Sequence, residues 1–105
     1  MSDKLLILTT SASEEEATKI AQVLVERRAA ACVNIIPHVH SVYRWQGKVE
    51  TAKEFLLLIK SSKLQEEKVR STLAELHSYA LPECLTVAVH GGSAEYLGWI
   101  DASLG

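Results

Sequence analysis

The sequence has few cysteines, few prolines and no excess of basic residues. Its 105 residues include two cysteines and two prolines, and the formal net charge is −2. Cys32 and Cys84 are too few and too far apart for a disulfide framework or for a zinc module built from paired CxxC motifs. We interpret them as reduced thiols. Nucleic acids and anionic membranes bind clustered basic faces, whereas the lysines and arginines here are scattered along the chain.

Long apolar runs are also missing. The longest, such as residues 55–59, fall far short of the roughly 18 residues that a membrane-spanning helix needs. A secretory signal has a charged region, an apolar region and a cleavage site with small residues. The N-terminal residues do not show this pattern before the first strand-like segment. We therefore expect a cytoplasmic protein that binds neither nucleic acid nor membrane.

The composition is that of one globular domain. Apolar residues make up 48% of the chain and charged residues 23%, which is typical of a protein with enough core to fold. The sequence contains no linker and no low-complexity tract that would divide it. Residues 1–105 are therefore interpreted as a single domain.

Hydrophobic periodicity predicts the order of the elements. Strands are expected at residues 5–10, 32–43, 48–60 and 84–90, and helices at about 13–30, from 62 and from 93. Ser13 with Glu16, and Ser62 with Gln65, fit the capping-box pattern that begins a helix. The order predicts a ferredoxin-like βαββαβ sandwich of the α+β class with an additional C-terminal helix. In this fold the first and third strands are central and the second lies at an edge.

Two features of the predicted sheet, its apolar central strands and its long hairpin, indicate that it contacts a partner. Helices cover one face of such a sheet, yet the central strands, LLIL at 5–8 and FLLLI at 55–59, are apolar on both faces. Pro37 indicates an edge strand or a bulge, because proline cannot donate to a neighbouring strand. The hairpin that follows would have arms of about 12 residues, roughly twice the usual strand length, and would extend past its own helices.

The tip of this extended hairpin carries apolar side chains that would be exposed in a single subunit. Tyr43, Trp45 and Val49 lie near the tip. Apolar surface and unpaired strand edges are usually covered in the native assembly. We therefore expect these residues to contact another subunit.

Several motifs along the chain match one family in order and spacing. They are CVNIIP at 32–37, SVYRW at 41–45, Gly47-Lys48 with Glu50, Lys60, His77 with Tyr79 and Glu83, and Tyr96-Leu97 with Trp99. Together they resemble the CutA family of divalent-cation tolerance proteins, from end to end of the chain. The resemblance implies a tight homotrimer with hairpin strands exchanged between neighbours, tolerance of copper and other divalent cations, and an architecture like that of the PII signalling trimers. It implies no catalytic reaction, so we do not expect an enzyme.

The resemblance also implies candidate metal ligands. Cys32 and His77 match family positions that could bind copper or another divalent cation. The sequence departs from the family at Ser78, where proline is usual, at Leu76, where some members have a second histidine, and at Thr9, where some have cysteine. Structural roles are open for both candidates, since Cys32 could be a small buried apolar residue and His77 could interact with a helix dipole.

A second candidate metal site is the pair His38 and His40. Residues two apart on a strand point to one face, and both imidazoles could then reach one ion. Two ligands do not make a site, however, and histidines of an edge strand facing solvent or a neighbour are equally consistent with the pattern.

Two functional hypotheses follow. The first is a cytoplasmic homotrimer that binds copper or another divalent cation in metal homeostasis or signalling. The second keeps the trimer but makes it a PII-like sensor of a small anionic metabolite, which rests on fold analogy. A ligand cleft between subunits could be lined by aromatic and charged residues, although packing with salt bridges would also explain them. The residues concerned are Lys60, Tyr79, Glu83, Tyr96 and Trp99.

Overall fold

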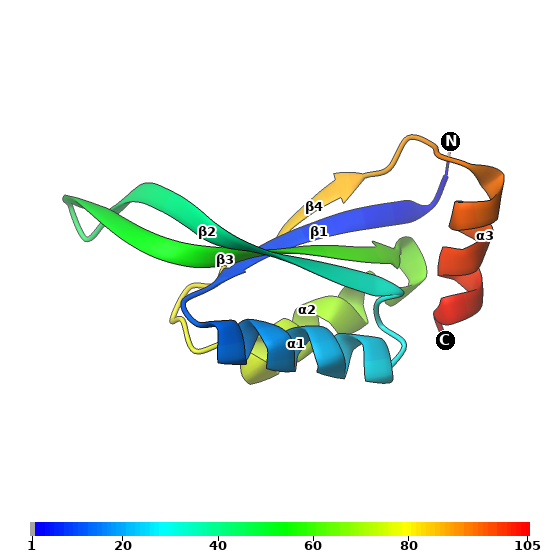
Figure 1. Cartoon of the computed structure of the whole chain (residues 1–105), viewed down its shortest axis with the longest axis horizontal. Coiled ribbons are helices and arrows are strands. Elements are labelled where there is room, and N and C mark those ends of the chain that lie inside the picture. Colours follow the sequence, from blue (N-terminus) through cyan, green and yellow to red (C-terminus); the bar gives the residue numbers. More distant parts are fainter. Residues whose placement is uncertain (1) are drawn as a thin grey trace.

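A computed structural model describes residues 2–105 and shows one four-stranded sheet with two helices against one of its faces (Figure 1). Along the chain the elements are β1 (Lys4–Ser11), α1 (Glu14–Glu26), β2 (Cys32–Trp45), β3 (Lys48–Ser62), the 3₁₀ turn η1 (Lys63–Gln65), α2 (Glu66–Leu76), β4 (Leu85–Ala88) and α3 (Ala94–Ser103). The strand order is β2-β3-β1-β4, and all neighbours are antiparallel. The predicted α+β class and the central positions of the first and third strands are confirmed.

The hydrophobic core lies between the sheet and helices α1 and α2. Every second residue of the central strands points to these helices, because side chains alternate between the two faces of a strand. Ile7 and Leu57 are fully buried on this face, where Ile20 of α1 and Val69 of α2 meet them. Helix α3 lies beyond the end of the sheet, where Lys4 Nζ forms an ion pair with Asp101 Oδ1 at 2.9 Å (Figure 1).

The opposite face of the sheet is apolar and is not covered by α1 or α2. We call it the open face, and its apolar side chains are Leu6, Leu8, Ile36, Leu56, Leu58, Leu85 and Val87. Leu8 lies directly opposite Leu58 on one side and Leu85 on the other. Leu85 is 58% exposed. This exposure fits the predicted need for a partner, although the structure describes one chain and the homotrimer stays a prediction.

The hairpin of β2 and β3 is even longer than predicted. Its strands contain 14 and 15 residues, and its tip extends well past the helices (Figure 1). Gln46 and Gly47 both have positive φ, at 50° and 80°, as the tight two-residue turns of hairpins require. Pro37 lies in a bulge of the edge strand, between Ile36 and Val39, which confirms its predicted position.

Several predicted element ends are wrong. Helix α1 ends at Glu26 rather than near residue 30, because Arg28 takes a left-handed conformation and the next two backbone N–H groups turn back to Leu24 O. Ser62 does not begin a helix with its side chain; it ends β3, and a 3₁₀ turn precedes α2. The fourth strand is limited to Leu85–Ala88. None of the helices formed by residues 2–105 is long and apolar enough to span a membrane.

Candidate functional site

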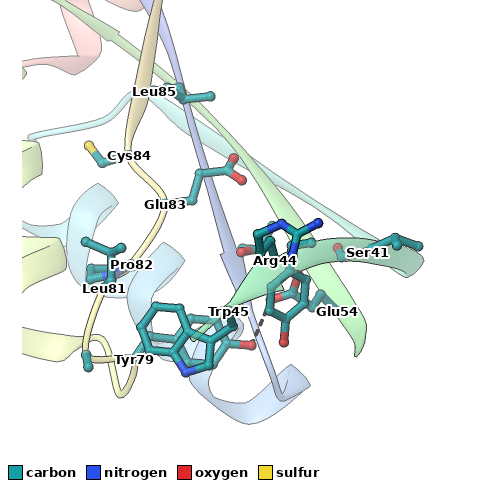
Figure 2. Close-up of a pocket in the computed structure, with 14 residues that line it drawn as sticks. Ser41, Arg44, Trp45, Glu54, Tyr79, Leu81, Pro82, Glu83, Cys84 and Leu85 are labelled. Carbon is teal, nitrogen blue, oxygen red and sulfur yellow. Dashed lines mark hydrogen bonds between the residues drawn. The ribbon is translucent and has the colours of Figure 1, made fainter. Parts of the chain in front are cut away.

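A pocket of about 850 Å³ lies between the hairpin and the segment that leads into β4 (Figure 2). Three parts of the chain form it. The end of β1 contributes Thr10, the hairpin contributes residues 41–45 and Glu54, and the third part is residues 79–85. Aromatic rings and carboxylates are both present in its lining. The pocket is therefore the first candidate for a binding site.

Glu54 is the most tightly held group of the pocket. Its side chain is buried, and Tyr79 Oη donates a hydrogen bond to Glu54 Oε2 at 2.7 Å (Figure 2). Burial alone would raise the pKa of Glu54, but side-chain hydrogen bonds from Ser41, Tyr79 and Thr10 outweigh it and lower the pKa. Burial and the neighbouring carboxylate raise the pKa of Tyr79, which keeps its hydroxyl as a donor. Glu54 is therefore a fixed negative charge.

Glu83 is the second carboxylate of the pocket, and its surroundings differ. Burial, followed by the nearby charge of Glu54, raises the pKa of Glu83. Within residues 2–105 Glu83 forms no ion pair. Arg44 is the cationic side chain of the lining, and its Nη1 donates to Gly47 O at 3.4 Å. Glu83 thus has no cationic partner in the structure.

His77 anchors the segment that leads into the pocket. Its side chain is 1% exposed, and its Nε2 lies 2.6 Å from Thr10 O. Its Nδ1 accepts from the backbone N–H of Tyr79 at 3.1 Å, so the ring proton is on Nε2, which donates to Thr10 O. Both nitrogens are therefore occupied within the subunit. A metal bound to His77 would have to break one of these hydrogen bonds.

Glu16 fixes the same segment from helix α1. Ser13 caps α1 by accepting from Glu16 N, as predicted, but the Glu16 carboxylate does not return to Ser13. It accepts instead from Ser78 N at 2.7 Å and from Ser78 Oγ at 2.9 Å. The capping-box prediction is therefore half correct. The second half is lost because Ser78 offers the carboxylate two donors.

Cys32 lies far from His77 in the subunit. It begins β2, is half-buried, and pairs with Lys60 on the side of the open face. Thr10, which His77 contacts, is opposite Leu56, which places it about 13 Å further along β3. The predicted ligands do not meet within one subunit. Nor do residues 2–105 contain any group of three or more histidine, cysteine or acidic side chains placed to hold a metal.

The geometry of His38 and His40 differs from that of a regular strand. The bulge between Ile36 and Val39 inserts an extra residue into β2, and His38 has a φ of 64°. Side chains therefore do not alternate regularly between the two faces of the strand at His38 and His40. The prediction that these two side chains share a face is not supported by this geometry.

The five predicted cleft residues are divided between two ends of the molecule. Tyr79 and Glu83 line the pocket, whereas the other three lie near α3. There Lys60 Nζ is 3.3 Å from Tyr96 Oη and 5.5 Å from the centre of its ring, and the Tyr96 and Trp99 ring centres are 5.4 Å apart. A cleft containing all five would require two subunits.

The predicted interface residues lie on both faces of the hairpin. Tyr43 and Trp45 share one face and line the pocket, with exposures of 44% and 42%. Val49 pairs with Arg44 on the other face and is 64% exposed. All three are accessible to a neighbour, and their contacts with one stay a prediction.

Glu54 is not among the predicted site residues, although it organises the pocket. The signal in the sequence is its position directly before the buried run at 55–59, where an acidic side chain needs partners. Those partners come from β1, β2 and residue 79. Nothing in the sequence brings these segments together before the fold is known.

Glu54→Gln should destabilise the protein by about 1.5–3 kcal/mol at pH 7, the range for hydrogen bonds to charged groups. The folded state lowers the pKa of Glu54 from its ordinary 4.5, so its contribution is present above that value and is lost as the pH falls through the lowered pKa. The difference between parent and variant should therefore shrink between pH 7 and pH 3 in urea unfolding. Glu50→Gln, at an exposed position of the same strand, is the control. A difference that is constant with pH would contradict the assigned cause.

Comparisons with known proteins match this chain to one family over almost its whole length. Residues 5–103 match the family model described as CutA1 divalent ion tolerance protein. The divalent-cation tolerance protein CutA of Thermus thermophilus is 43% identical over 100 residues, which are 95% of this chain and 97% of that protein. Among solved structures, CutA of Xylella fastidiosa has a TM-score of 0.96 and 43% identity, covering 99% of this chain and all of that one. A periplasmic divalent cation tolerance protein CutA from Archaeoglobus fulgidus has a TM-score of 0.92 and 38% identity, covering 95% and 97%.

Proposed function

The chain belongs to the CutA1 divalent ion tolerance family, and from this premise we propose that it is a homotrimer that binds copper or another divalent cation in metal homeostasis or signalling. We propose no catalytic reaction for it. The proposed location is the cytoplasm, where the free thiols of Cys32 and Cys84 would stay reduced.

The observation that carries the proposal is the open face. A sheet face of leucine, isoleucine and valine side chains is rarely left in water, and further copies of the same chain would cover it. Cys32 lies at the edge of this face, next to Lys60. Within residues 2–105 of one subunit no three candidate ligands lie together, so a site with Cys32 and His77 would have to be completed across a subunit boundary.

The anionic-metabolite hypothesis is not favoured. The pocket contains the charged Glu54 and the unpaired Glu83, and the guanidinium of Arg44 already donates to a backbone carbonyl. An anion would meet net repulsion in such a lining.

Cys32→Ser should lower the affinity for Cu(I) on the order of tenfold or more, because a thiolate is the soft ligand that Cu(I) prefers. Competition with a chromogenic Cu(I) chelator measures the change. Cys84→Ser is the matched control, since it removes the other thiol of the chain. His77→Ala should also weaken binding, and its melting temperature must be followed because His77 holds residues 77–79 in place.

Other results would assign copper elsewhere. If the double variant His38→Ala/His40→Ala alone loses copper, the site lies in the hairpin. If every variant binds like the parent, copper binding is adventitious and the proposed metal role is wrong.

A further inference from the structure

The pocket of Figure 2 combines three aromatic rings with two carboxylates. Tyr43 and Trp45 come from the hairpin, Tyr79 comes from the segment that leads into β4, and Glu54 and Glu83 belong to the same lining. The pocket volume of about 850 Å³ is that of a small-molecule site. Aromatic faces and carboxylates share one preference in ligand chemistry, because both attract positive charge.

We propose that this pocket binds an organic ammonium group. The electron-rich face of a ring attracts a cation within about 6 Å, and tryptophan is the strongest of the aromatic residues in this respect. A carboxylate beside the rings supplies the opposite charge, while the rings contact the alkyl groups around the nitrogen. The inference goes beyond divalent-cation tolerance, and it requires the pocket to stay accessible in the proposed trimer, where Tyr43 and Trp45 are also expected to contact a neighbour.

A metal ion fits the same lining less well. Aromatic rings donate no ligand atoms, and Mg²⁺ and Ca²⁺ take six or more oxygen ligands. The part of the chain described by the structure has no cluster of three or more metal-binding side chains, here or elsewhere. The rings and carboxylates together therefore favour an organic cation over a metal.

The two carboxylates have different roles in this site. Glu54 already accepts a hydrogen bond from Tyr79, and the nearby Ser41 and Thr10 side chains help to lower its pKa, so it provides a fixed charge. Glu83 has no such donors, and its raised pKa reflects burial together with repulsion by Glu54. An ammonium group next to Glu83 would relieve that repulsion. Glu83 is therefore the carboxylate whose loss should matter most to the ligand.

The test uses tetramethylammonium chloride with the full chain at constant ionic strength. The chain has two tryptophans, so Trp99→Phe leaves Trp45 as the reporter of pocket occupancy. Tetramethylammonium should change the Trp45 fluorescence saturably, whereas tert-butanol, which is similar in shape and uncharged, should not. Calorimetry of the parent chain checks the same binding without the reporter substitution.

Glu83→Gln should weaken tetramethylammonium binding by about tenfold or more, because the charged contact of this half-buried side chain with the ammonium group is lost. Glu50→Gln makes the same change at an exposed position of the hairpin outside the pocket lining and should have no effect. Circular dichroism and melting curves show whether each variant is folded. For a variant that fails to fold, Trp45→Phe tests the same site, since it should weaken binding and retain an aromatic ring.

Four outcomes would overturn the proposal. Equal binding of tert-butanol would mean that the pocket is merely apolar, and equal binding by Glu83→Gln would mean that charge does not matter. If the Lys60→Met variant binds tetramethylammonium and the parent does not, the Lys60 side chain of a second copy occupies the pocket in the parent. Displacement of tetramethylammonium by Mg²⁺ at equal concentration would instead indicate a metal site.

Discussion

Replacing Leu58 by aspartate is expected to leave the chain unassembled at concentrations at which the parent is expected to form a trimer. Leu58 lies at the centre of the open face, opposite Leu8 on β1 and Asn34 on β2. Burial of a leucine side chain contributes about 1.5–3 kcal/mol, and a trimer contains three copies. An aspartate there would in addition bury an unpaired charge. Sedimentation at low concentration should give three subunits for the parent and smaller species for the variant.

The control for this prediction is Leu64→Asp. Leu64 lies in η1, outside the open face, and is 87% exposed. The same substitution there should leave the sedimentation coefficient unchanged. A parent that sediments as a monomer, or a Leu58→Asp variant that sediments like the parent, would mean that the open face does not hold the assembly together. Because folding and assembly are coupled in the proposed trimer, reversible melting of the parent should also depend on protein concentration.

The sheet could be predicted from the sequence because its signals are local. Runs that are apolar on both faces mark the central strands, and Pro37 marks the edge strand, since each pattern reflects how one segment is buried or paired. Element ends were less predictable, because a serine can satisfy a local helix-capping pattern and still be taken by a strand. Ser62 shows this, as it pairs with Lys4 at the end of β3.

The pocket could not be predicted because its contacts join residues that are far apart in the sequence. Tyr79 and Glu54 are 25 residues apart, and His77 contacts Thr10 over 67 residues. Sequence patterns identified Tyr79 and Glu83 as residue types suited to a ligand cleft, and Trp45 as a residue of the subunit interface. They did not show that Tyr79 would fix Glu54, or that both nitrogens of His77 would be occupied by the backbone. Those facts depend on the register of the hairpin and on the path of residues 77–84.

Trp45→Ala should cost the assembly about 2–4 kcal/mol, since tryptophan dominates interface energetics when it fills a neighbour's pocket. The hairpin projects past its own helices, and the Trp45 indole stays 42% exposed in one subunit, which leaves surface for a neighbour to bury (Figure 1). The loss should be measured as a shift in the midpoint of reversible unfolding at several protein concentrations.

The dependence of assembly on protein concentration distinguishes the contact of Trp45 within its own subunit from the contact expected with a neighbour. A loss confined to its own pocket would lower the midpoint equally at every concentration, because the number of associated subunits would not change. A loss between subunits should raise the concentration at which the trimer forms. Val49→Ala probes the other face of the same tip and removes less apolar surface, so its effect should be smaller. If Trp45→Ala changes neither the midpoint nor the assembly, the hairpin tip is solvated in the native protein, and the open face alone must hold the subunits together.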